Sequence, residues 1–327
     1  MLLLNRASKI CIKKRNKTLL NISQSFFSQL NYYYLNMESS KSKGKVIVIT
    51  GANKGIGYGV MQSLMETNED TLILTSRNKE LGLKAFEELK EKVPNSKCNL
   101  EYFTLDITKS ETYSPFAQYI RDNYGQIDTM VNNAGVATKG DTFNLDVFDF
   151  TFEVNVYGTI AFTEYLIKED LIRSNGKIII VGSTAGQLKV ITNEDIKSEF
   201  VAEDLDVDKI LDLAKRFRKA IEQDTWKEEG WPASTYRVSK ICINSYARVL
   251  GNRKEIAERG IQCYSCCPGW VKTDMGGPNA YRTLEEGVVT PVYLVNLEYA
   301  VNNEYQGKFF FDSQVYDFTT SEPIVLK

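Results

Sequence analysis

Histidine is missing from all 327 residues of the chain. Because histidine is the side chain whose ordinary pKa lies nearest neutrality, any acid–base chemistry must use other groups. The sequence also lacks an apolar run long enough for a membrane-spanning helix, and it has neither internal repeats nor low-complexity tracts. Hydrophobic residues make up 43% and charged residues 25% of the chain. This composition is typical of a soluble globular protein, so we expect no membrane association.

Cysteine is scarce as well, and its positions argue against metal binding. A structural zinc site needs four converging ligands, and histidine cannot contribute any. Three of the cysteines fall on one expected buried strand, where successive side chains point to opposite faces. We therefore expect no metal site and interpret the thiols as reduced groups in the core or near a pocket. The six cysteines are Cys11, Cys98, Cys242, Cys263, Cys266 and Cys267.

Acidic residues are absent from residues 1–37, although this segment carries several basic ones. The rest of the chain has an excess of acidic side chains, which argues against nucleic-acid binding. A basic, acid-free segment is typical of a mitochondrial presequence. Alternatively, Met37 is the true start, the segment is disordered, and the protein is cytoplasmic. In either case we expect a basic N-terminal extension of residues 1–37 and one folded domain of residues 38–327.

The first apolar segment of that domain leads into a glycine-rich turn. Residues 45–50 form a short β-branched run, typical of a buried parallel strand, and residues 58–65 read as a helix. A strand, a glycine turn and a helix N-terminus together bind phosphate, because backbone N–H groups and the helix dipole favour an anion. We expect the turn to bind a dinucleotide cofactor through Gly51, Asn53, Lys54, Gly55, Ile56 and Gly57.

The second expected strand, residues 71–76, indicates which dinucleotide is bound. A site selective for NADH usually has an acidic residue at this strand's end, where it accepts a hydrogen bond from the ribose. Here the strand is followed by Arg77, which can pair with a 2′-phosphate, and Lys54 supplies a second cation nearby. The pattern therefore favours NADPH/NADP+ as cofactor, although Arg77 is also compatible with a simple surface turn.

Tyr236 and Lys240 supply the acid–base chemistry that histidine cannot. On a helix, residues four apart lie on the same face, so the ammonium group should lie beside the phenol. A free tyrosine has a pKa of roughly 10, and a neighbouring positive charge should lower it. The pair thus predicts a general acid. Alone the spacing is weak, since it also occurs on solvated helix faces.

Taken together, these motifs resemble the short-chain dehydrogenase/reductase family over about residues 44–312. The resemblance implies an α/β fold, a single doubly wound Rossmann sheet with helices on both faces. It implies a catalytic tetrad of Asn155, Ser183, Tyr236 and Lys240, in which Asn155 anchors a water and Ser183 binds the carbonyl oxygen. It also implies that Lys240 holds the nicotinamide ribose. Further cofactor contacts are implied for Asp106, Ile107, Asn133, Ala134, Gly135, Tyr236, Lys240, Pro268, Gly269, Val271 and Thr273.

Within the family the chain is similar to the monomeric carbonyl reductases, and plant menthone and alkaloid-ketone reductases share the layout. The stretch between Ser183 and Tyr236 is much longer than the family usually has, an insertion at about residues 187–232. Residues 208–223 within it predict an amphipathic helix. By resemblance, such an insertion covers the helices that other members use to assemble, so we expect a monomer.

The expected activity is NADPH-dependent reduction of aldehydes, ketones and quinones to alcohols. Trp231, Trp270 and Met275, with Ser183 and Tyr236, are the candidate substrate contacts, a wall suited to flat apolar carbonyl compounds. Both tryptophans are equally compatible with ordinary packing. Two alternatives stay open: a dedicated reductase of one metabolite ketone, and a non-catalytic NADPH-binding regulator.

Overall fold

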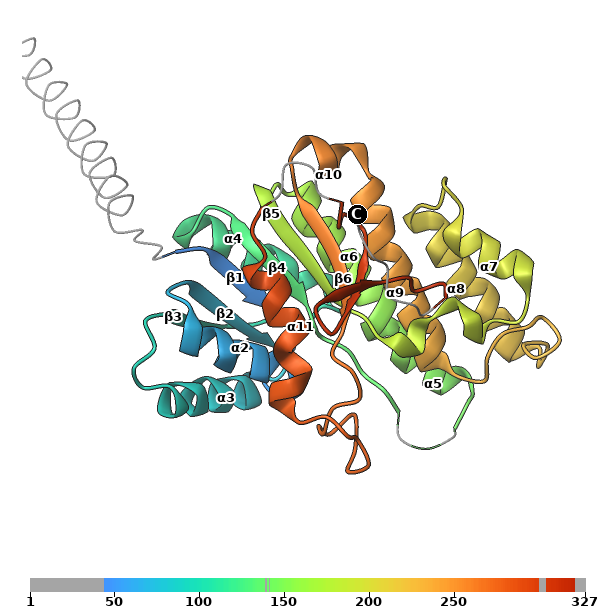
Figure 1. Ribbon diagram of the computed structural model, residues 1–327, viewed down its shortest axis with the longest axis horizontal. Coiled ribbons are helices and arrows are strands. Elements are labelled where there is room, and N and C mark those ends of the chain that lie inside the picture. Colours follow the sequence, from blue (N-terminus) through green and yellow to red (C-terminus); the bar gives the residue numbers. More distant parts are fainter. Residues whose placement is uncertain (1–43, 139, 141, 300–303, 321–327) are drawn as a thin grey trace, which may run out of the picture. The chain divides into compact units, whose positions relative to one another are not determined.

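Short apolar segments build one central sheet in the described part of the protein. The structure, a computed structural model, describes residues 44–138, 140, 142–299 and 304–320 (Figure 1). The expected extension of residues 1–37 lies outside these described residues, so its role stays a prediction. Eight strands have the order β3-β2-β1-β4-β5-β6-β7-β8. The first seven in this order pair in parallel and the last is antiparallel, which confirms the doubly wound fold.

Strands and helices alternate along the chain as the sequence predicts. The strands are β1 (Val46–Ile49), β2 (Thr71–Ser76), β3 (Asn99–Thr104), β4 (Ile127–Asn132), β5 (Ile172–Val181), β6 (Gln262–Cys267), β7 (Phe309–Phe311) and β8 (Gln314–Tyr316). The longer helices are α2 (Gly55–Thr67), α3 (Lys79–Lys92), α4 (Tyr113–Asn123), α5 (Leu145–Phe152), α6 (Thr159–Lys168), α7 (Glu194–Val201), α8 (Val207–Glu222), α9 (Thr235–Asn252), α10 (Lys254–Glu258) and α11 (Leu284–Asn296). The antiparallel β8 was not predicted.

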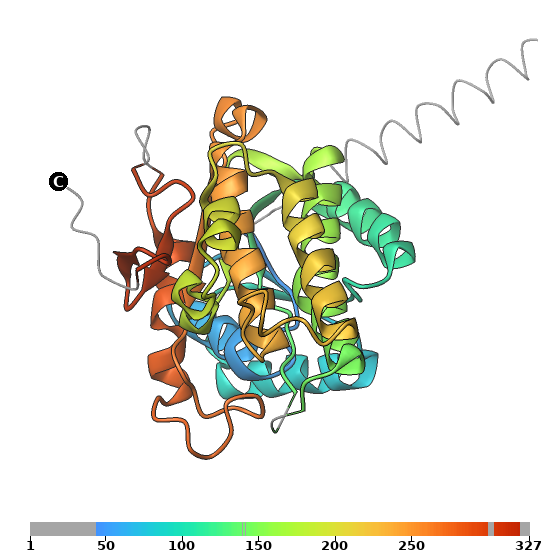
Figure 2. The same cartoon turned by 90° about the vertical axis from the view of Figure 1, so that its right-hand side faces the viewer.

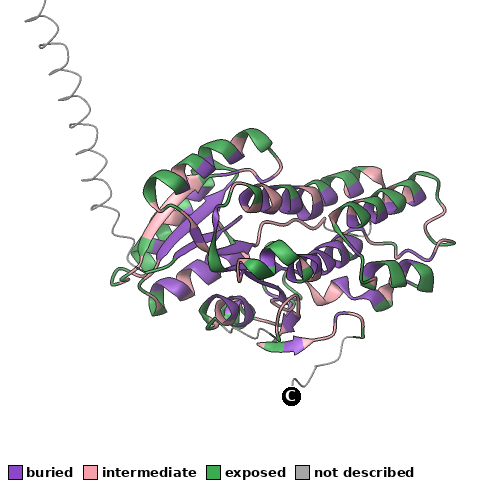
Figure 3. Ribbon diagram, turned by 90° about the horizontal axis from the view of Figure 1, so that it is seen from above, coloured by how far each residue is buried: buried purple, intermediate pink, exposed green. Residues whose placement is uncertain are grey.

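The sheet separates two apolar cores. Val46 and Val48 of β1 belong to one cluster, and Ile47 and Ile49 to the other, because successive strand side chains point to opposite faces. The first cluster includes side chains of α4, α5, α6, α8 and α9. The second includes those of α2, α3 and α11. Central strands are therefore buried on both faces, as the purple strands of Figure 3 show.

The insertion contributes α7 and α8, and α8 packs along α9 (Figure 2). The predicted helix of residues 208–223 is confirmed, because α8 spans Val207–Glu222. Its buried face contains Ile210, Leu213, Ala214, Phe217 and Ala220, and Ile221 is half-buried.

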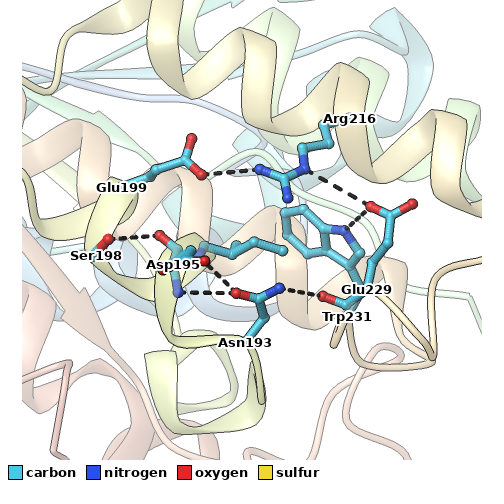
Figure 4. Close-up of polar contacts among 8 residues, drawn as sticks. Asn193, Asp195, Ser198, Glu199, Arg216, Glu229 and Trp231 are labelled. Carbon is cyan, nitrogen blue, oxygen red and sulfur yellow. Dashed lines mark hydrogen bonds and ion pairs between the residues drawn. The ribbon is translucent and has the colours of Figure 1, made fainter.

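Polar contacts link α7, α8 and the segment that precedes α9, the helix that carries Tyr236 (Figure 4). Arg216 of α8 lies 3.0 Å from Glu199 of α7 and 3.8 Å from Glu229. Glu229 also accepts a 3.4 Å hydrogen bond from the Trp231 indole, and its backbone carbonyl accepts one of 3.1 Å from Asn193. These contacts connect α7, α8 and the segment that enters α9.

Candidate active site

A cavity of about 560 Å³ opens where the parallel strands end. Its lining includes residues directly after β1, β2, β3, β4, β5 and β6, such as Gly51, Arg77, Leu105, Asn133 and Gly182. In a doubly wound sheet, ligands bind outside the carboxyl ends of the strands, at the point where the strand order reverses. Here that point lies between β1 and β4, which contribute two sides of the same cavity.

The glycine turn brings backbone close to the cavity and leaves a helix N-terminus without a side-chain cap. Gly51 has φ of 61°, and a Cβ on it would lie 2.9 Å from the Ala134 Cα. A Cβ on Gly57 would collide with the Asn133 amide. Helix α2 begins at Gly55, and its N-cap Lys54 makes no side-chain capping hydrogen bond. The first N–H groups of α2 therefore remain available to an anion.

Hydrogen bonds between the segments after β1 and β4 fix the shape of this end of the cavity. The Asn133 side chain donates to the Thr50 carbonyl at 2.8 Å. The Thr50 hydroxyl accepts from the backbone N–H groups of Asn133 and Ala134, each at 3.0 Å. These hydrogen bonds fix the segment after β1 relative to the segment after β4 at the cavity wall.

Two cationic and two acidic side chains line the cavity where a cofactor is expected. Arg77 follows β2 and lines the cavity. Asp106 also lines it, and its carboxylate accepts hydrogen bonds from the Thr108 backbone at 3.0 Å and hydroxyl at 2.8 Å. Lys54 lines it as well and forms an ion pair of 2.9 Å with Asp274. Arg77 and Lys54 thus both line the cavity, and Lys54 is paired with Asp274.

The predicted acid–base pair lies at the start of α9, one turn apart on the cavity wall. Ser234 caps this helix by accepting from the Arg237 backbone at 3.3 Å. The Lys240 Nζ lies 5.7 Å from the centroid of the Tyr236 ring and donates to the Val181 carbonyl at 2.9 Å. The Tyr236 phenol is hydrogen-bonded to the Ser183 side chain. The structure therefore brings Ser183, Tyr236 and Lys240 together.

Burial dominates the ionisation of both groups. It raises the pKa of Tyr236 to about 12, although the hydrogen bond from Ser183 acts to lower it. Burial also lowers the pKa of Lys240 to about 8, since the charged form loses solvation. The prediction of a lowered Tyr236 pKa is wrong in its net direction, because desolvation is the largest influence on the phenol. The phenol is fully protonated at neutral pH, which suits a proton donor.

Asn155 lies within a π-helical turn, η2 (Glu153–Gly158). Such turns often mark functional sites because they redirect side chains. The Asn155 amide accepts from the Val136 N–H at 2.7 Å and donates to the Val136 carbonyl at 2.9 Å and the Ser239 hydroxyl at 3.1 Å. Its side chain thus links the segment after β4 to α9, and the water-anchoring role stays a prediction.

Most of the predicted cofactor residues line the cavity, and Gly57, Gly269 and Val271 do not. Gly57 is buried against Asn133, Gly269 adopts φ of 82°, and Val271 is 3% exposed. The predicted site residues that line the cavity are Gly51, Asn53, Lys54, Gly55, Ile56, Arg77, Asp106, Ile107, Asn133, Ala134, Gly135, Tyr236, Lys240, Pro268, Thr273 and Met275.

The two candidate substrate tryptophans lie outside the cavity lining. Trp231 is 3% exposed and packs on Phe217 with ring centroids 5.1 Å apart, so it is a core side chain. Trp270 is exposed, and its indole donates to the Gly276 carbonyl at 2.7 Å. Packing, the alternative that the sequence left open, therefore describes Trp231. Met275 does line the cavity.

Sequence reasoning missed several lining residues: Thr108, Val136, Ala137, Phe150, Val154 and Asp274. The sequence pattern could have indicated one of them, Phe150. Residues 145–152 contain three phenylalanines, of which Phe148 and Phe152 share one helix face and Phe150 does not. An aromatic side chain on the outer face of an amphipathic helix indicates a second apolar environment.

Comparison with known proteins places the chain in a family. The short chain dehydrogenase profile matches residues 45–194. The chain is 33% identical to rat (Rattus norvegicus) carbonyl reductase (NADPH) 3 over 263 residues, covering 78% of this chain and 92% of that protein. It is 32% identical to mouse (Mus musculus) carbonyl reductase (NADPH) 1, covering 84% and 98%. The protein therefore belongs to the short-chain dehydrogenase/reductase family and is an oxidoreductase.

Solved structures agree with this assignment. Salutaridine reductase from Papaver somniferum matches with a TM-score of 0.72 and 27% identity, covering 82% of this chain and 99% of that one. Menthone neomenthol reductase from Mentha piperita matches with a TM-score of 0.68 and 25% identity, covering 82% and 98%. Over the described ranges, no helix has the length and apolarity needed to cross a bilayer. The same ranges contain no metal-ligand cluster.

Proposed function

We propose that this protein reduces carbonyl compounds to alcohols with NADPH as the hydride donor. The observation that carries the proposal is the position of Tyr236 and Lys240 in the lining of a cavity whose other residues include a glycine turn and two cations, with Ser183 beside Tyr236. The similarity to carbonyl reductases supports the same activity. Aldehydes, ketones and quinones are the proposed substrates.

The charges and hydrogen-bond donors of the cavity residues match the groups of NADPH. The N-terminus of α2 has no acidic residue in its first turn and no side-chain cap, which suits a pyrophosphate. Arg77 and Lys54 provide charge for the 2′-phosphate. A Cβ at Gly135 would lie 3.3 Å from Asn155 Oδ1 and 3.8 Å from Lys240 Nζ, so glycine keeps the wall open there. These features favour NADPH over NADH.

When bound, the cofactor supplies a hydride to the carbonyl carbon. Tyr236 donates its phenolic proton to the carbonyl oxygen, so that hydride and proton together complete the alcohol. Ser183 donates a hydrogen bond to the same oxygen and stabilises the negative charge that develops there. Lys240 places a positive charge beside the tyrosine as its proton leaves, which lowers the energy of the transient phenolate.

A second candidate is a dedicated reductase of one ketone, favoured by the likeness to salutaridine reductase and menthone neomenthol reductase. The broad activity is the better supported of the two, because the apolar side chains at the cavity wall fix few polar groups of a substrate. A non-catalytic regulator requires that the catalytic tetrad be idle, yet Tyr236 and Lys240 line one cavity and Ser183 lies beside Tyr236.

The deciding experiment measures NADPH oxidation by the full chain with quinones, aromatic aldehydes and monoterpene ketones, and repeats each assay with NADH. Turnover of several unrelated carbonyls with NADPH preferred is the expected result. Turnover of one ketone alone favours the dedicated reductase. Tight NADPH binding without any turnover would refute the catalytic proposal and favour the regulator.

We further propose a cytoplasmic monomer. Helix α8 covers part of α9 with a buried apolar face, which removes that face from any subunit contact. Light scattering coupled to size exclusion should give the mass of one chain. A tetramer mass would contradict the proposal, and imaging of a fluorescent fusion tests the compartment.

A further inference from the structure

Asn244 lies on the same face of α9 as the proposed acid–base pair. Tyr236, Lys240 and Asn244 follow one another at intervals of four residues, and residues four apart share a helix face. The side chain of Asn244 is 1% exposed. A buried amide of this kind finds its hydrogen-bond partners within the protein. Those partners therefore indicate what this position of the helix does.

The Asn244 amide nitrogen binds the segment that carries Ser183. Its Nδ2 donates to the backbone carbonyl of Ser183 and to that of Gly186, each at 3.1 Å. Ser183 is the N-cap residue of the short 3₁₀ turn η3 (Thr184–Gly186). The Gly186 N–H also donates to the Ser183 carbonyl, at 3.0 Å. One side chain thus holds both the residue before the turn and the last residue of the turn.

The same turn orients the Ser183 hydroxyl. Its oxygen accepts a hydrogen bond from the Ala185 N–H at 3.0 Å, and the Ser183 side chain is also hydrogen-bonded to the Tyr236 phenol. A hydroxyl has one proton to donate and two acceptor lone pairs. Because the Ala185 N–H occupies one lone pair, it restricts the directions in which the proton can point. The direction of the Ser183 hydroxyl therefore depends on the conformation of the turn.

Two glycines allow α9 to approach this segment closely. A Cβ on Gly186 would lie 2.4 Å from the backbone carbonyl carbon of Lys240, and a Cβ on Gly182 would lie 2.0 Å from the Asn244 Oδ1. Lys240 adds a further contact, because its Nζ donates to the Val181 carbonyl at 2.9 Å. Lys240 and Asn244 therefore bind the backbone before and after Gly182.

The hydrogen bonds of Asn244 are made by its amide nitrogen. Its Oδ1 is buried and has no hydrogen-bond partner among the described residues. A buried acceptor without a partner lowers the free energy of unfolding, since it has given up its hydrogen bonds to water. Stability alone therefore does not explain an asparagine at this position. The two hydrogen bonds that it donates to the turn do.

We infer that Asn244 is a positioning residue, which fixes the turn after β5 so that the Ser183 hydroxyl can donate to the carbonyl oxygen of the substrate. This inference rests on the proposed carbonyl reduction. A donor stabilises the developing negative charge best when it is already held in place before the reaction, and a small displacement of such a group lowers the rate strongly. Asn244 contacts the backbone of Ser183 and acts through it.

A double-mutant cycle tests whether Asn244 acts through Ser183. The variants of the full chain are Asn244→Leu, which removes both donors at similar side-chain volume, Ser183→Ala, and the two combined. Ser245→Ala is the matched control, because Ser245 is the next residue of α9, is 0% exposed, and has a hydroxyl without a partner among the described residues. The measured quantities are the single-turnover rate of NADPH oxidation with 9,10-phenanthrenequinone and the Kd for NADPH.

We expect Asn244→Leu to lower the single-turnover rate about tenfold, with the Kd for NADPH within about twofold of wild type. Ser183→Ala should lower the rate about a hundredfold. In the Ser183→Ala protein, adding Asn244→Leu should lower the rate less than about twofold, since the hydroxyl that Asn244 positions is gone. Ser245→Ala should match wild type. An unchanged rate in Asn244→Leu, or a further loss of about tenfold in the Ser183→Ala protein, overturns the inference.

Failure of the proposed function has a different signature, which is wild-type protein that does not reduce the quinone. In that case, hydrogen–deuterium exchange of the peptide that covers residues 181–187 decides the inference. Faster exchange there in Asn244→Leu than in Ser245→Ala supports the positioning of the turn, and equal exchange contradicts it. If Asn244→Leu does not fold, Asn244→Ala takes its place in both measurements.

Discussion

The Lys54 Nζ lies 2.9 Å from the Asp274 Oδ2 and thereby joins two walls of the cavity. Lys54 belongs to the glycine turn before α2, and Asp274 to the segment after β6. Both side chains are largely exposed, 66% and 77%, so the pair adds little to folding stability. Its importance lies in binding, because a lysine paired with a carboxylate is less available to a phosphate.

Replacement of Asp274 by asparagine should tighten NADPH binding by up to about fivefold, the equivalent of one weak ion pair. NADH lacks the 2′-phosphate, so its affinity should not change. Fluorescence titration of both cofactors measures the effect. Lys54→Ala is the complementary variant and should weaken NADPH more than NADH. Equal changes for the two cofactors in either variant would show that Lys54 does not read the 2′-phosphate.

Removal of the Tyr236 hydroxyl should stop the reaction without affecting the cofactor. We expect Tyr236→Phe to lower kcat at least about a hundredfold, as is usual for loss of a general acid, with the Kd for NADPH within about twofold of wild type. Tyr281→Phe serves as control, since this tyrosine is 65% exposed and lies outside the cavity lining. A Tyr236→Phe variant that keeps most of its activity would refute the mechanism.

The pH dependence of reduction should be set by Lys240. Burial lowers its pKa to about 8, while the Tyr236 phenol keeps its proton until about pH 12. As pH rises above about 8, the ammonium is lost and kcat/KM should fall about tenfold per unit. In Lys240→Arg the guanidinium stays charged, so the residual activity should lack this limb. A wild-type profile that is flat to pH 10 would contradict the assignment.

Phe217 should be a large contributor to stability because it joins the insertion to the catalytic helices. It is 0% exposed and its ring contacts those of Phe143, Phe148, Phe152 and Trp231. Phe217→Ala should lower the free energy of unfolding by about 3–5 kcal/mol, measured by urea denaturation. Leu83→Ala, at an exposed position on α3, should change it by less than about 0.5 kcal/mol. Similar losses in both variants would contradict the packing argument.

The sequence predicted the sheet well because its strands are short apolar runs between turns, and the motifs lie directly after those runs. The glycine turn, Arg77 and Asn133 therefore reached one cavity as expected from parallel-strand geometry, whereas Tyr236 reaches it from the start of α9. Helix α8 was predictable from its apolar period. Each of these features depends on local spacing, which the sequence displays directly.

Side-chain environments were not predictable in the same way. Trp231 packs inward against Phe217 of the preceding helix, α8. The local sequence around Trp231 does not reveal this contact. The pKa of Tyr236 depends on how closely the whole fold surrounds it, so spacing to Lys240 alone predicted the wrong direction. Phe150 lines the cavity from a helix that also packs against α8 and α9, and its local sequence does not show that arrangement. β8 was not predicted because a strand of three residues is too short to show an alternating pattern.

Helix α5 contacts the insertion on one side and the cavity on the other, and this double role has an evolutionary consequence. Arg218 of α8 donates to Asp149 at 2.9 Å, and Phe217 packs on Phe148 and Phe152. A change in how α8 sits on α5 would therefore shift Phe150, which lines the cavity. Sequence drift in a segment remote from the chemistry thus reaches the cavity wall while the catalytic residues remain unchanged. For an engineer, libraries built on α8 are accordingly a way to reshape the cavity without altering Tyr236 or Lys240.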